Sequence, residues 1–404
     1  MSLKSGLDLS HIKSSVRPQD DLFRFMNGKW LDESEIPADR ASDGAFYWLY
    51  EQAEKQVKQI IEEQAASKSA NGTIAQKIGD LYNSFMDEAR ANELGIKPIA
   101  AELAKAQSFK DAKEFHQLLG ELEARGLGGL FYAYVTTDHM DSTQNIVYLG
   151  QSGLSLPDEA YYREDTYAEI RTAFTTHIAK MFSLAGLPNG DAAAKLILEL
   201  ETEIAASHWD QVKDRDATLT YNKKSFNDLA AITTHFDWPT WIAASATPEH
   251  VLEKVIVRQP SYFEGLSKIL GKFEINKWQA WLTWHILSST APYLNQEIVQ
   301  ENFNFYGTTL SGIPKLKDRW KRGVGLVEGA LGEAVGQIYV AKYFPEKAKT
   351  RMVDLVKNLI EAYRIDIAAL DWMSQETKEK AFVKLDKFTP KIGYPDKWRD
   401  YSKL

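Results

Sequence analysis

Apolar residues recur at every third or fourth position along most of this 404-residue chain, which is the spacing of one face of an α-helix. The segment 347–371 is the clearest case. Its apolar stripe consists of Met352, Val356, Leu359, Tyr363, Ile367 and Leu370. Because such a stripe is stable only when another element covers it, the chain has to pack helix against helix. The sequence therefore predicts a mainly α fold.

Comparable stripes predict helices through most of the remaining chain. We expect them over about 20–30, 43–60, 74–85, 99–106, 110–124, 165–184, 191–207, 225–232, 278–288 and 293–306, with a further helix that starts at Pro248. Residues 129–137 and 145–151 differ, because they are short and rich in aromatic and β-branched residues, with turn-like residues between them. This pattern predicts a small β-hairpin.

The length bounds the number of domains. A chain of 404 residues is long enough for two or three, since single cores stop growing near ~250–300 residues. A charged break at 210–216 is followed by Thr220, Tyr221 and Asn222. We place a domain boundary there.

Charge and composition exclude several classes of function. The formal net charge is −8, which argues against a nucleic-acid partner, because that affinity rests on clustered Lys and Arg. The most apolar run, 126–135, is ten residues long, and a membrane-spanning helix needs ~20. The start of the chain has no apolar leader, and the chain has no cysteine. We therefore expect a cytoplasmic protein without a membrane partner.

No catalytic centre is evident from the residues alone. No two of the eight histidines stand four apart, so no H-E-x-x-H pair can hold zinc on one helix face. His250 and Glu253 are the closest ligand-like pair, and a surface histidine is the simpler interpretation. There is no G-x-S-x-G elbow, and the spacing of Gly329, Gly332 and Gly336 favours close helix packing over phosphate binding. On chemistry alone the chain is a helical scaffold.

Several short motifs, taken in order, resemble the neprilysin family of zinc endopeptidases, and its bacterial oligopeptidases most closely. They are 23–30 (FRFMNGKW), 36–39 (IPAD), 81–87 (LYNSFMD), 151–158 (QSGLSLPD) with Tyr161-Tyr162, Arg319-Trp320, 331–333 (LGE), 371–373 (DWM) and 391–396 (KIGYPD). Each motif is weak by itself. Their order and spacing carry the resemblance.

The resemblance implies a zinc-dependent endopeptidase that acts on peptides and is built as two mainly helical lobes around an enclosed cavity. Residues 1–222 would form the N-terminal portion of the catalytic lobe, and the β-hairpin would lie in it. Residues 228–390 would form the smaller lobe that covers the substrate cavity. Residues 391–404 would begin the return into the catalytic lobe.

The same resemblance implies that the zinc-binding residues lie outside this chain. The family's H-E-x-x-H helix and third zinc ligand would follow residue 404, so no catalytic or metal residue can be carried over. We expect zinc in the intact enzyme, none bound to this chain, and no activity of this chain by itself. A family arginine that meets the C-terminal side of the peptide aligns with Ser42, and the nearest arginine is Arg40. These two residues are the predicted substrate-binding site.

Two functions stay open at this point. One is the N-terminal region of a neprilysin-like zinc metalloendopeptidase, whose partners would be peptide substrates and a missing C-terminal segment. The other is a non-catalytic helical binding or scaffold module derived from that family. Half a lobe should leave an apolar face uncovered, because its packing partners are elsewhere. An H-E-x-x-H in frame after Leu404 would favour the first function, and a stop codon there would favour the second.

Overall fold

The computed structural model describes residues 8–404, which form two compact units. The first unit combines the residues up to Asp87 with Lys317–Leu404, and the second unit is the intervening segment Glu88–Leu316. This division differs from the predicted boundary near residue 222, because chain on both sides of that residue contributes strands to one sheet of the second unit. The functional roles predicted for the two lobes stay predictions.

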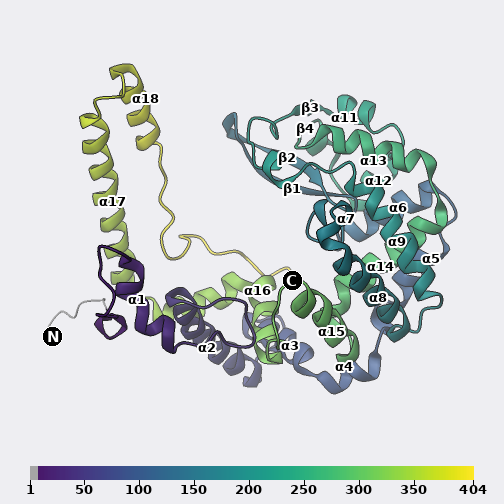
Figure 1. Ribbon diagram of the computed structural model, residues 1–404, viewed down its shortest axis with the longest axis horizontal. Helices are drawn as coiled ribbons and strands as arrows, with labels where there is room; N and C mark the ends of the chain where they lie inside the picture. Colours follow the sequence, from purple (N-terminus) through teal and green to yellow (C-terminus); the bar gives the residue numbers. More distant parts are fainter. Residues whose placement is uncertain (1–7) are drawn as a thin grey trace. The chain divides into compact units, whose positions relative to one another are not determined.

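Helices dominate both units, so the predicted mainly α fold is confirmed (Figure 1). The first unit contains α1 (Leu22–Glu33), α2 (Ala45–Ala66), α3 (Ile74–Met86), α16 (Arg319–Tyr343), α17 (Glu346–Ala369) and α18 (Gln375–Asp386). The helices of the second unit are α4 (Glu88–Leu94), α5 (Ala100–Ser108), α6 (Ala112–Glu123), α7 (Ala160–Arg163), α8 (Ala168–Leu184), α9 (Gly190–Ala205), α10 (Gln211–Asp214), α11 (Phe226–Ile232), α12 (Trp238–Ser245), α13 (Pro260–Lys272), α14 (Ile275–Thr290) and α15 (Gln296–Phe303). No helix in residues 8–404 combines the length and the apolar character that crossing a bilayer requires.

Four short strands form one sheet in the second unit, in the order β1-β2-β4-β3. The strands are β1 (Phe131–Asp138), β2 (Asp141–Gln151), β3 (Lys223–Ser225) and β4 (Lys254–Val257). β1 and β2 pair antiparallel and are the predicted hairpin, which is confirmed with a tighter turn than the expected 138–144. β4 pairs in parallel with β2 and antiparallel with β3.

The strand β4 replaces the helix that was expected to start at Pro248. A single 3-10 turn, Glu249–Leu252, leads directly into the strand. Val255, Ile256 and Val257 are all fully buried. Because both faces of β4 are covered, its residues form a continuous apolar run without alternation, and periodicity cannot separate such a run from a buried helix.

The core of the second unit gathers around α14. Trp278, Trp281 and Trp284 lie on one face of this helix and are at most 1% exposed. Two of the indole N–H groups donate to the loop that follows β2: Trp281 to the Gly153 carbonyl (3.2 Å) and Trp284 to Ser155 Oγ (2.8 Å). These bonds satisfy the polar edges of large buried rings, as burial requires.

The same loop is fixed from a second side by Glu201 of α9, which is fully buried. Its carboxylate accepts hydrogen bonds from the Ser155 backbone N–H (3.0 Å) and hydroxyl (2.7 Å) and from the Tyr162 hydroxyl (2.5 Å). His285 Nε2 lies 3.0 Å from Oε1 of the same carboxylate, the oxygen that also accepts from the Ser155 hydroxyl. A buried carboxylate with this many partners is satisfied, so the motif 151–158 has a structural role here.

In the first unit, α2, α3 and α16 pack against one another. Ile60 and Ile61 of α2, Ile78 of α3 and Val327 of α16 are fully buried between them. The axis of α16 is interrupted at Leu331, whose backbone is not helical (φ −127°, ψ 26°).

The predicted helix over 347–371 is α17, and its apolar stripe is uncovered. None of its residues is buried. α17 packs beside α18 (Figure 1), and Met352, Leu355, Leu359 and Tyr363 remain between 43% and 54% exposed. The sequence pattern predicted the helix correctly, but within the first unit no element buries its stripe among the described residues.

Candidate functional site

The two predicted substrate-binding residues lie in the loop between α1 and α2. The Arg40 backbone N–H donates to the Pro37 carbonyl (3.2 Å), which closes a short turn. α2 then begins at Ala45, after Gly44. Arg40 and Ser42 therefore stand immediately before the N-terminus of a long helix.

Arg40 is the centre of an ion-pair cluster. Its guanidinium contacts Glu51 of α2 through Nη2, lies 3.3 Å from Asp43 through Nη1 and 3.6 Å from Asp39 through Nε. Burial lowers the pKa of Arg40, but the hydrogen bond to Glu51 and the negative charges of Glu51, Asp43 and Asp39 together outweigh it, so the net shift is upward. With a side chain only 11% exposed, Arg40 is a cation held in one orientation by charge-assisted hydrogen bonds.

Tyr47 joins the two predicted residues. The Ser42 hydroxyl donates to the Tyr47 hydroxyl oxygen (3.0 Å). The Arg40 guanidinium carbon lies 5.2 Å from the centroid of the same ring, within the range of a cation–π contact. The structure thus brings Arg40 and Ser42 to one place, and their contact with a peptide stays a prediction.

Acidic and basic side chains from α2 and α16 surround this cluster. Lys321 of α16 donates to Asp39 (2.5 Å), and that bond lowers the pKa of the Asp39 carboxyl. Glu54 of α2 is only 8% exposed, and burial raises its pKa while Lys321 partly opposes the shift. Burial also raises the pKa of Glu328, and the charge of Glu54 adds to it. Lys321 therefore ties α16 to the loop that precedes α2, beside the site.

An exposed apolar surface adjoins the cluster on the first two turns of α2. Its residues, with their exposed fractions, are Phe46 (88%), Trp48 (60%), Leu49 (53%) and Tyr50 (55%). Our sequence reasoning did not single out this surface. The run 46–50 (FYWLY) could have signalled it, because a helix turn that is apolar all round cannot bury every face against one partner.

This arrangement is suited to binding. The Arg40 guanidinium has five N–H donors, and the hydrogen bonds to Asp43 and Glu51 use two of them. The other donors can hold a carboxylate or a peptide carbonyl with directed hydrogen bonds. Aromatic rings beside it can cover apolar side chains of the same ligand. Arg40, Ser42, Tyr47 and the surface 46–50 together are the candidate functional site.

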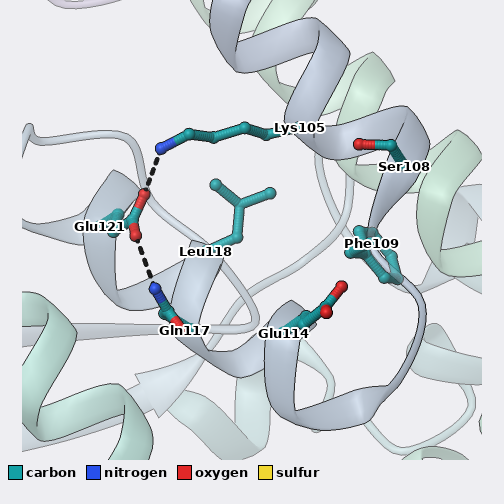
Figure 2. Close-up of a pocket in the computed structure, with 7 residues that line it drawn as sticks. All are labelled: Lys105, Ser108, Phe109, Glu114, Gln117, Leu118 and Glu121. Atoms are coloured by element: carbon teal, nitrogen blue, oxygen red, sulfur yellow. Dashed lines mark hydrogen bonds and ion pairs between the residues drawn. The ribbon is translucent and has the colours of Figure 1, made fainter.

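A pocket of about 330 Å³ between α5 and α6 of the second unit is a weaker candidate (Figure 2). Its charged groups already bind one another: Lys105 donates to Glu121 (2.7 Å), and Gln117 donates to the same carboxylate (3.0 Å). Glu114 accepts the Lys110 backbone N–H (2.8 Å). Since these groups pair internally, little is left to orient a ligand.

Nothing in residues 8–404 assembles a metal site from the predicted ligand types. No group of three or more His, Asp or Glu side chains in this part of the chain could hold a metal ion. His250 and Glu253 belong to no such group.

Known proteins match nearly the whole chain. The family described as "Peptidase family M13" matches residues 18–395. The inhibitor-bound crystal structure of the zinc metalloprotease Zmp1 of Mycobacterium tuberculosis matches with a TM-score of 0.95 at 46% sequence identity, over 100% of this chain and 61% of that chain.

Among curated proteins, endothelin-converting enzyme 1 of Homo sapiens is 27% identical over 414 residues, which are 98% of this chain and 53% of that protein. The neutral endopeptidase of Lactobacillus helveticus is 26% identical over 394 residues, which are 96% of this chain and 60% of that protein. The chain thus spans between about half and three-fifths of the length of these relatives.

Proposed function

This chain belongs to peptidase family M13, and we propose that it is the N-terminal region of a neprilysin-like zinc metalloendopeptidase that cleaves peptides. The family resemblance predicted from the motifs is confirmed by the match over residues 18–395. The observation that carries the proposal is the similarity of the entire chain to the zinc metalloprotease Zmp1. That similarity covers 61% of the Zmp1 chain, and we propose that the activity requires residues beyond those present here.

The proposed role of the candidate site is to hold the peptide. Arg40 would meet the C-terminal side of the bound peptide. The Ser42 hydroxyl would hold the Tyr47 ring in place beside the Arg40 guanidinium. The apolar surface 46–50 would cover side chains of the same peptide. Interactions of this kind contribute uniform binding, so their loss raises KM more than it lowers kcat.

The residues of this chain do not fit a zinc site. The 404 residues contain no H-E-x-x-H, and residues 8–404 contain no ligand cluster. We therefore propose that zinc in the intact enzyme is bound by residues outside this chain. The chain alone would then bind no stoichiometric zinc and hydrolyse no peptide.

The uncovered apolar surfaces support a further polypeptide partner. The stripe of α17 and the start of α2 present large apolar side chains to solvent. Patches of this kind on a stable fold mark interaction surfaces. We propose that a C-terminal segment, equivalent to the part of Zmp1 that this chain does not match, covers them.

A chimera tests the proposed function. The chain is fused to the C-terminal part of Zmp1 that lies outside the match, and a fluorogenic peptide reports hydrolysis. We expect no hydrolysis and less than stoichiometric zinc for the chain alone, and chelator-sensitive hydrolysis for the chimera. Chelator-sensitive hydrolysis by the chain alone, or one tightly bound zinc per chain in metal analysis, would overturn the proposal.

Two variants of the chimera test the site residues. Arg40→Lys keeps the charge but loses the guanidinium fork, so KM should rise by about tenfold with little change in kcat. Ser42→Ala removes only the hydroxyl contact to Tyr47, and KM should rise by less. Unchanged KM in Arg40→Lys would remove this residue from the peptide site without affecting the family assignment.

The remaining proposals concern location and partners. The cysteine-free, acidic composition supports a cytoplasmic protein that binds neither nucleic acid nor membranes. Fractionation of the source cells tests the location. A filter-binding assay with duplex DNA at low salt tests whether the protein binds nucleic acid.

A further inference from the structure

The sheet of the second unit has two edges, and they are built differently. The edge strand β3 is three residues long and carries Lys223 and Lys224, both of which discourage pairing with another chain. The opposite edge strand, β1, is eight residues long and contains no Pro, Lys, Arg or Glu. Its ladder is regular up to an irregularity between Thr137 and Asp138. β1 therefore lacks the usual protection of a sheet edge.

The pairing of β2 shows which β1 residues face outward. The Leu149 carbonyl accepts from the Arg258 backbone N–H (2.9 Å), and the Gln151 N–H donates to Gln259 (3.0 Å), so both residues point toward β4. In an antiparallel ladder the residues opposite them then point away from β2. Those residues are Ala133, opposite Leu149, and Phe131, opposite Gln151.

By the same alternation, Val135 also directs its N–H and C=O to the free side of β1. No described residue hydrogen-bonds these outward groups of Phe131, Ala133 or Val135. Phe131 itself is only 4% exposed, so the accessible donors and acceptors are those of Ala133 and Val135, at the two-residue spacing that an added strand requires.

The surroundings of this edge are apolar and aromatic. Tyr132 and Tyr134 are each 38% exposed and Val135 is 65% exposed. The Tyr134 ring stacks on Tyr132 on one side (5.9 Å) and on the buried Tyr148 on the other (5.3 Å). In Figure 1 the end of the hairpin projects beyond the helices that cover the sheet.

We propose that the outer edge of β1 binds the extended backbone of a peptide substrate as an additional strand. This inference rests on the proposed function for the identity of the ligand, and it concerns a surface separate from the candidate site at Arg40. Backbone hydrogen bonds would supply affinity without a sequence requirement, and Tyr132, Tyr134 and Val135 would favour apolar side chains in the peptide.

A second copy of the chain suits this edge less well than a peptide does. The regular part of β1 runs from Phe131 to Thr137, where the register becomes irregular. A strand of this length spans roughly 24 Å. Pairing along it buries much less than the ~1,600 Å² of a standard stable interface, but it matches the reach of a short extended peptide.

The test uses the 404-residue chain and a fluorescein-labelled peptide of alternating valine and threonine, about 12 residues long, with fluorescence anisotropy as the measurement. Val135→Pro removes an outward N–H without removing a ladder bond, which an edge strand tolerates. We expect binding to weaken by about tenfold or more. Val135→Thr keeps the N–H and a β-branched side chain, and should bind within about threefold of the wild type. If the proline variant fails to fold, Val135→Lys replaces it, because a lysine on an edge strand opposes pairing by its charge and should also weaken peptide binding.

Three outcomes would overturn the inference. They are equal binding by Val135→Pro, no binding of the peptide by the wild-type chain, and a wild-type dimer that Val135→Pro dissociates, which would make a second copy the occupant. None of them involves hydrolysis. Failure of the chimera to hydrolyse a peptide would instead count against the proposed function and leave this binding result standing.

Discussion

His116 is a base buried among aromatic rings. It lies on α6 and is 1% exposed, and its ring centroid is 5.6 Å from that of Phe115 and 4.6 Å from that of Phe236. Burial lowers its pKa from 6.5 to about 4, although Asp237 and the backbone of Ala112 partly oppose the shift. The folded second unit therefore holds this imidazole in its neutral form at neutral pH.

From this we predict that the second unit loses stability as the pH falls from about 6.5 to about 4. In this window the unfolded chain binds a proton at His116 that the folded chain does not, so stability rises with pH. The gap between the two pKa values corresponds to roughly 3 kcal/mol. His208 adds an effect of the same sign, because burial also lowers its pKa to about 4.

Urea unfolding across this pH range measures the effect. His116→Phe keeps an aromatic ring in the same place and should reduce the slope of stability against pH. The remaining slope is left to His208 and to His177, since burial lowers the pKa of both. His250→Asn changes an exposed histidine and should leave the slope as it is. A slope that is the same in His116→Phe and in the wild type would contradict the prediction.

The candidate site shows which residues sequence reasoning can and cannot find. Arg40 and Ser42 were reached through the alignment of one family position. Their meeting at Tyr47 depends on the path of the loop before α2, and spacing along a chain does not determine that path. The exposed run 46–50 was missed because a helical stripe indicates an apolar face without indicating what covers it.

At the scale of elements, most helices follow from periodicity, whereas their packing does not. Gly329, Gly332 and Gly336 were predicted to allow close helix approach. In α16, a Cβ added to Gly329 or Gly332 would meet no atom within 4 Å, and at Gly336 the nearest atom is in the Trp398 ring at 3.4 Å. The close approach occurs instead at Gly120 of α6, where spacing gave no indication of it.

We predict opposite effects on stability when Gly120 and Gly329 are each replaced by alanine. At Gly120 an added Cβ would lie 2.6 Å from the Trp241 carbonyl oxygen and 2.7 Å from Ala244 Cβ of α12. Because one of these neighbours is backbone, Gly120→Ala should force α6 and α12 apart and destabilise the second unit by about 1–3 kcal/mol.

Gly329→Ala is the matched substitution in open space on a helix. It should stabilise the first unit by roughly 0.5–1 kcal/mol, since alanine loses less backbone freedom on folding. Urea unfolding followed by hydrogen exchange measures the stability of each unit separately. Equal effects of the two substitutions on stability would contradict this prediction, because they would show that α6 and α12 can move apart at Gly120 at little cost.

At the scale of the whole molecule, the division into units depends on contacts between distant parts of the chain. The first unit joins residues on both sides of an inserted segment of more than two hundred residues, Glu88–Leu316. One such contact is the Lys77 ammonium, which donates to the Tyr401 carbonyl (2.7 Å). The domain boundary near residue 222 was predicted from the charged break at 210–216. Strands from both sides of that break belong to one sheet, and only three-dimensional pairing shows this.

The uncovered apolar surface 46–50 of the first unit should make the isolated chain associate. Phe46 and Trp48 are 88% and 60% exposed at the start of α2, so the chain alone should associate and bind a hydrophobic dye. The double substitution Phe46→Ser with Trp48→Ser should shift sedimentation toward the monomer and reduce dye fluorescence by about half or more. Val212→Ser is the control, because Val212 is 82% exposed but isolated on the short helix α10.

Fusion to the C-terminal segment should have the same effect as the double substitution. If the partner proposed for this surface is correct, the chimera with wild-type Phe46 and Trp48 should be monomeric and bind little dye. A wild-type chain that is already a monodisperse monomer with little dye binding would mean that this surface needs no cover. A chimera that still associates through Phe46 would mean that the surface belongs to a different partner.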